Sequence, residues 1–109
     1  MVISDLKTIL ESTGLPVAYY KFPADEEQEL PVIAFLETGS NNFAADDRVY
    51  QKVSSFDVEL YTQFKDPATE ALVEAALSSA SIVWEKTETY LDTELCYEII
   101  YEIEVFIDG

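Results

Sequence analysis

The last quarter of the chain alternates between apolar and polar positions. From Tyr97 to Val105 every odd position is apolar or aromatic, while the even positions include three glutamates. Because successive side chains of a strand point to opposite faces, this pattern predicts a strand with one apolar face and one acidic face. Together with the segment 82–90 it predicts a C-terminal hairpin. The candidate acidic face consists of Glu98, Glu102 and Glu104.

Two segments have the spacing of amphipathic helices. Apolar residues at 2, 3, 6, 9 and 10 indicate a short N-terminal helix that ends at Gly14–Pro16. A second helix is expected to begin at Asp66–Pro67, where the carboxylate can accept a hydrogen bond from a free backbone amide, and to run to about Ala80. We expect its buried stripe to consist of Leu72, Val73, Ala76, Leu77 and Ala80, and its polar stripe of Glu70, Glu74 and Ser78.

Three further strands are predicted between these helices, over 17–20, 32–36 and 48–62. The run 32–36 is continuously apolar, which is typical of a central strand, and 48–62 contains the alternation of a half-buried one. The resulting order is α-β-β-β-α-β-β. We therefore expect one α+β domain over 1–109, an antiparallel β-sheet with both helices packed on one face.

Two polar segments are expected to project between strands as loops. One is the acidic segment 23–29, and the other is 38–47, which is rich in turn-forming residues and has one large apolar residue. We predict that they contact partner proteins. The candidate contact residues are Asp25, Glu26, Glu27, Asn41, Asn42, Phe43 and Asp46.

The charge of the chain argues against two classes of partner. There are 22 acidic residues against 6 lysines and arginines, a formal charge of −16. Phosphate binding needs a basic patch, so we expect neither stable nucleic-acid binding nor attraction to an anionic membrane. Because no run of about 18 apolar residues or signal-peptide pattern occurs, we expect a protein made in the cytosol.

Few residues suited to catalysis are present. The chain has no histidine, no glycine-rich phosphate loop and a single cysteine, Cys96, which we expect to be a passive thiol. Carboxylate pairs such as Asp46–Asp47 or Glu102–Glu104 suit a glycosidase or a divalent-ion site, but such pairs arise by chance among 22 acids. We predict no catalytic residue, no metal and no cofactor, and hence no enzyme.

Four aromatic residues of the last hairpin leave two interpretations open. Trp84, Tyr90, Tyr97 and Tyr101 form either a surface patch or part of the core, and alternating strand positions favour the core.

Several stretches carry a resemblance to a known family, namely 40–46, 49–52, 59–62 with 65–67, and 85–90 with 100–103. They resemble small virion proteins of long-tailed phages and prophages of Gram-positive bacteria. The resemblance spans roughly residues 2–106. Within these virion proteins, the chain is similar to the head-to-tail joining and tail terminator group. It implies an α+β fold, hexameric rings that cap the tail tube, and contacts with tail tube and head-connector proteins. It also implies assembly in the host cytoplasm and a place in the virion.

The resemblance gives the acidic strand face an expected role. Glu98, Glu102 and Glu104 would line the channel of a ring and repel the DNA that passes through it. The alternative, from a different class, is an acidic inhibitor that mimics DNA in the basic groove of a nuclease or repressor. A small hydrolase that uses a carboxylate pair is a third class.

Overall fold

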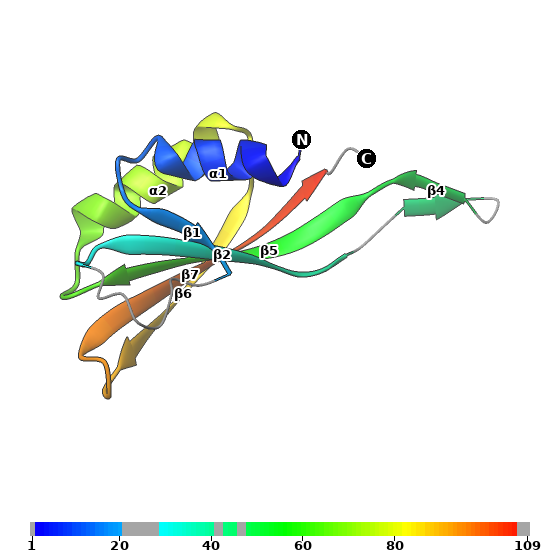
Figure 1. Ribbon diagram of the computed structural model, residues 1–109. Helices are drawn as coiled ribbons and strands as arrows, with labels where there is room; N and C mark the ends of the chain where they lie inside the picture. Colours follow the sequence, from blue (N-terminus) through cyan, green and yellow to red (C-terminus); the bar gives the residue numbers. More distant parts are fainter. Residues whose placement is uncertain (1, 21–28, 41–42, 46–47, 107–109) are drawn as a thin grey trace.

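The protein is a five-stranded sheet with two helices on one face (Figure 1). The computed structural model describes residues 2–20, 29–40, 43–45 and 48–106, and for 43–45 and 48–51 it describes the backbone alone. The α+β class and the two helices are confirmed. The elements are α1 (Ile3–Glu11), β1 (Val17–Tyr19), β2 (Val32–Ser40), β3 (Phe43–Ala45), β4 (Arg48–Gln51), β5 (Val53–Thr62), α2 (Pro67–Ser79), β6 (Trp84–Leu91) and β7 (Cys96–Phe106).

The sheet is mixed, so the prediction of a wholly antiparallel sheet was wrong. Its strand order is β1-β2-β5-β7-β6, and β1 runs parallel to β2, with Val17 opposite Ile33. The other neighbours are antiparallel. A parallel pair needs a connection of roughly a dozen residues or more, and the twelve residues between Tyr19 and Val32 satisfy that requirement.

The segment between Ser40 and Val53 also differs from the expectation. The strand predicted over 48–62 is interrupted at Lys52, and part of the predicted loop 38–47 is strand, so the order is α-β-β-β-β-β-α-β-β. Strands β3 and β4 pair with each other. We call this two-stranded segment, Phe43–Ala45 with Arg48–Gln51, the arm. The arm continues β2 and β5 beyond the sheet (Figure 1), and the longest extent of the molecule is 50 Å.

The core lies between the helices and the sheet. On β5 and β7 the buried positions are the alternate ones, with Phe56 opposite Ile103 and Val58 opposite Tyr101. Leu6 and Leu10 of α1 and Val73 and Leu77 of α2 cover them. The predicted apolar face of the last strand is therefore confirmed.

The stripes predicted for α2 were partly wrong. Glu70 is only 2% exposed, whereas Leu72 is 49% exposed. The helix begins at Pro67 with Asp66 as its cap, and the backbone amide of Thr69 donates to Asp66 Oδ1 over 3.2 Å. Because residues three and seven apart share one helix face, Glu70, Val73 and Leu77 turn together toward the sheet. Leu72 lies off that face.

The aromatic residues of the last hairpin divide between core and surface. Tyr101 is fully buried, and the ring of Trp84 meets it edge-on with centroids 5.5 Å apart. Tyr97 packs against the core, but Tyr90 is exposed. The core interpretation thus holds for three of the four. Neither helix in the described ranges has the length and apolarity to cross a membrane.

Candidate functional site: an acidic sheet face

The face of the sheet turned away from the helices is acidic. Its positions on β5 and β7 alternate with the buried ones, and its positions on β6 follow from the pairing with β7. We call this surface the acidic face and define it by its six carboxylates. They are Asp57, Glu59, Glu85, Glu98, Glu102 and Glu104.

Three of these carboxylates form a row across the three strands. Glu102 on β7 is the Cα partner of Asp57 on β5 and of Glu85 on β6. Side chains at directly opposite positions of a sheet lie about 5 Å apart at Cβ, and like charges there are destabilising. The row therefore weakens the fold, and it stays in contact with water, since Glu85 and Glu102 are exposed.

No basic residue of β5, β6 or β7 lies on this face. The one basic residue of these three strands is Lys86, which is the Cα partner of the buried Tyr101 and so points to the helix side. Its Nζ lies 2.9 Å from Glu70 Oε1 and 2.9 Å from Glu74 Oε2. The three strands therefore place no positive charge beside the row.

A tyrosine hydroxyl contacts two carboxylates of the acidic face. The Tyr61 hydroxyl lies 2.9 Å from Glu59 Oε1 and 2.8 Å from Glu98 Oε2, and donates to these carboxylates. Burial and the two neighbouring carboxylates raise the pKa of Tyr61, so the phenol keeps its proton. Burial raises the pKa of Glu59 as well, since the hydrogen bond from Tyr61 offsets it only in part and Glu98 and Asp57 repel a further negative charge.

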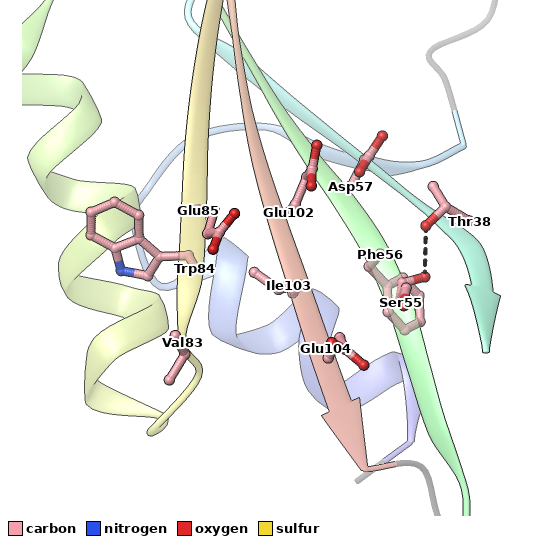
Figure 2. Close-up of a pocket in the computed structure, with 10 residues that line it drawn as sticks. All are labelled: Thr38, Ser55, Phe56, Asp57, Val83, Trp84, Glu85, Glu102, Ile103 and Glu104. Carbon is pink, nitrogen blue, oxygen red and sulfur yellow. Dashed lines mark hydrogen bonds between the residues drawn. The ribbon is translucent and has the colours of Figure 1, made fainter. Parts of the chain in front are cut away.

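A hollow of about 560 Å³ opens at the end of the acidic face near the foot of the arm (Figure 2). Figure 2 shows Glu85, Glu102 and Asp57 side by side across the strands, with Trp84 pointing away from them toward α2. Four of the ten lining residues are acidic and none is basic. The hollow is lined by Thr38, Ser55, Phe56, Asp57, Val83, Trp84, Glu85, Glu102, Ile103 and Glu104.

The helix side contains a contrasting set of charges. Lys65 lies 2.8 Å from Glu70 and also pairs with Glu88, while Lys86 bridges Glu70 and Glu74. Burial alone would raise the pKa of Glu70, but hydrogen bonds from the two lysines hold it below its ordinary value. The Tyr101 hydroxyl donates to Glu74 over 2.9 Å. We call these groups the ion-pair network, and they fasten α2 to β6 and β7.

The three acidic residues singled out in the sequence share one face of the sheet. Glu98, Glu102 and Glu104 all lie on the acidic face, with Glu98 partly buried against Tyr61 and the other two exposed. Sequence reasoning did not include Asp57, Glu59 or Glu85 in the site. The alternation of Asp57 and Glu59 with apolar residues was visible in the sequence, but the register that sets Asp57 and Glu85 beside Glu102 was not.

The predicted contact loops lie mostly outside the described residues. This holds for Asp25, Glu26, Glu27, Asn41, Asn42 and Asp46, and also for the pair Asp46–Asp47. The backbone of Phe43 is described and opens β3, so this residue belongs to the arm and not to an irregular loop.

The groups of the acidic face can repel anions and attract cations. Within the described ranges, no three acidic or cysteine side chains are grouped as a metal site would require. Burial, with Glu94 and Glu98 nearby, raises the pKa of Cys96, so its thiol remains protonated and unreactive near neutral pH. Comparison of the chain with protein-family models gives no match, and comparison with curated proteins gives none.

Proposed function

We propose that the protein is a structural component of a phage or prophage virion, a ring subunit of the tail terminator or head-to-tail joining class, without catalytic activity. The observation that carries the proposal is the row Asp57–Glu102–Glu85 on a sheet face that the helices leave open. The sequence resemblance supplies the class. The projecting arm and the outer edge of β6, with which none of the described strands pairs, are features that ring subunits use to contact one another.

The acidic face suits the wall of a channel for DNA. Duplex DNA carries one negative charge per about 1.7 Å of axis, so carboxylates that face it repel its backbone along the whole path. A ring with six copies of this face toward its lumen would let DNA slide without binding. Subunits made in the host cytoplasm would assemble onto the tail tube and meet the head connector.

Purified particles test the virion assignment directly. In long-tailed particles whose genome encodes this chain, quantitative mass spectrometry should detect about six copies per particle, as the hexameric ring implies. Antibody labelling should mark the end of the tail next to the head. Absence of the chain from purified infectious particles would contradict the proposal.

The lumen assignment has its own experiment. Replacing Glu102 with lysine should make DNA bind in the channel and lower infectivity, while particles still assemble. The matched control replaces Glu94 with lysine, which changes the net charge equally at an exposed site outside the acidic face. A cryo-EM map of the ring with the acidic face on its outside would rule the lumen role out.

The row of carboxylates also favours a second candidate, an acidic protein that mimics DNA. In that case the acidic face would occupy the basic groove of a nuclease or repressor, and binding would weaken steeply as salt is added. One-to-one binding to such an enzyme, together with absence from virions, would favour this candidate over the ring subunit.

A further inference from the structure

Strand β7 is longer than the edge strand that covers it. β6 begins at Trp84, which pairs with Ile103, whereas β7 continues to Phe106. Before Trp84 the chain comes from the helix layer, where Ile82 is buried. Within the described ranges, no strand pairs with the outer edge of β7 from Glu104 to Phe106. We call this open edge the notch.

The notch has the surroundings of a strand-binding site. Exposed apolar side chains flank it, Val83 at 83% and Phe106 at 56% exposure, and the 560 Å³ hollow opens beside it. Glu85, Glu102 and Glu104 line that hollow. Unpaired strand edges readily bind an added strand through backbone hydrogen bonds, while side-chain pockets select which strand binds. A strand that fits here needs apolar residues and positive charge.

Strand β4 meets that description in its sequence. It reads Arg48-Val49-Tyr50-Gln51 and is followed by Lys52, and no acidic residue occurs from 48 to 56. Arg48 and Lys52 are the two basic residues closest to each other in the sequence of a chain of charge −16. In the described part of the arm, β4 pairs with β3 alone, so its other edge is open.

The arm of the same molecule cannot occupy the notch. Only Lys52 separates β4 from β5, and β5 covers the opposite edge of β7, with Val53 paired to Phe106. Figure 1 shows the arm running away from the sheet in line with β5. The strand that enters the notch must therefore come from a second molecule.

We propose that the notch of one molecule binds β4 of a second copy, which adds a strand to β7 in line with β6. The four residues of β4 match the three open positions of β7 in length. The contact joins two different surfaces, head to tail, and repetition of such a contact closes into a ring when the rotation allows. The inference rests on the self-association in the proposed function and specifies its surface.

Disulfide trapping between copies tests the contact. In a Cys96→Ala background, one sample carries Val83→Cys, and a second, tagged sample carries Val49→Cys or Tyr50→Cys. A disulfide needs Cα atoms within about 7 Å, so mixing under mild oxidation should give a tagged heterodimer with at least one β4 variant. Glu11→Cys on exposed α1 is the matched partner that should give none. Equal trapping with Glu11→Cys, or none with either β4 variant, overturns the contact.

Charge reversal tests the same contact without cysteines. Arg48→Glu and Glu104→Lys should each weaken association about tenfold, and the double variant should recover most of the loss. Lys7→Glu and Glu11→Lys make the same changes in charge on α1 and should leave association near that of the unaltered chain. Association that follows net charge alone, with no recovery in the double variant, overturns the proposal.

The two proposals can fail separately. Trapped heterodimers from a chain that is absent from virions would leave the notch contact standing and overturn the virion role. A chain present in virions that gives no β4 disulfide would do the reverse.

Discussion

The two faces of the sheet differ in whether their carboxylates have basic partners. On the helix-covered face, Lys65 and Lys86 pair with Glu70, Glu74 and Glu88 in the ion-pair network. On the acidic face the Tyr61 hydroxyl contacts two of the six carboxylates, Glu59 and Glu98, and none of the six receives a cation from β5, β6 or β7. Two of the six basic residues of the chain are thus committed to fastening α2.

This contrast separates stability from function. Ion pairs on the helix side hold a buried carboxylate in place, so their effect belongs to the fold. The row Asp57–Glu102–Glu85 opposes the fold, because like charges at opposite strand positions repel. Departures from local consistency of this kind mark functional surfaces, which supports assigning the acidic face to a role outside folding.

Adjacent isoleucines on β7 provide the largest contrast between the faces. Ile99 is fully buried against the helices, and Ile100 lies on the acidic face, partly exposed. We expect Ile99→Ala to lower the free energy of unfolding by about 3 kcal/mol and Ile100→Ala by about 1 kcal/mol or less. Urea denaturation of both variants measures the difference. Equal losses would show that both faces are packed alike.

Removing one carboxylate from each face should change stability in opposite directions. Glu70→Gln leaves Lys65 and Lys86 without their shared partner, and should cost about 2 kcal/mol. Glu102→Gln relieves repulsion in the row and should stabilise by about 0.5 kcal/mol. Thermal and chemical unfolding report both signs. Destabilisation by Glu102→Gln would contradict this account, because it would mean that a positively charged group neutralises the row.

The pH dependence should also differ between the faces. The raised pKa of Glu59 means that the folded state takes up a proton more readily, so stability rises as pH falls from 7 toward 4.5, the ordinary glutamate value. The lowered pKa of Glu70 has the opposite sign, and its contribution is lost as pH falls below 4.5. Unfolding at a series of pH values should therefore show a maximum above 4.5. Glu59→Gln should remove the rise and Glu70→Gln the fall.

Salt gives the smallest effect. Screening weakens repulsion among exposed charges more than attraction in the partly buried network, so the stability of the chain should rise by a few tenths of a kcal/mol between about 20 and 300 mM salt. The triple variant Asp57→Asn, Glu85→Gln, Glu102→Gln should lose most of that rise. A fall in stability with salt would show that the ion-pair network dominates.

The sequence predicted the two faces of β7 but not their neighbours. Alternation at 97–105 is a local property, so Glu98, Glu102 and Glu104 were placed together correctly. The row with Asp57 and Glu85 depends on strand register, which tertiary packing and the turns set. The parallel direction of β1 likewise depends on the path of the chain and not on strand propensity.

The burial of Glu70 shows another limit of local patterns. A glutamate in a helix is normally predicted to be exposed to solvent. The lysines that pair with the buried Glu70 carboxylate lie at 65 and 86, outside the helix. The break at Lys52 had no local signal either, since residues 48–62 have continuous strand propensity. Both features follow from contacts between distant segments.

Light scattering on a sizing column, at about 20 and 300 mM salt, tests most directly whether the acidic subunits form a ring. The net charge of −16 per subunit disfavours association at low salt, and this repulsion outweighs the two local attractions of Arg48 and Lys52. The proposed ring should therefore appear as a shift from monomer toward six times the mass of one chain as salt rises. A monomer at both salt concentrations, or an oligomer that dissociates when salt is added, would contradict it.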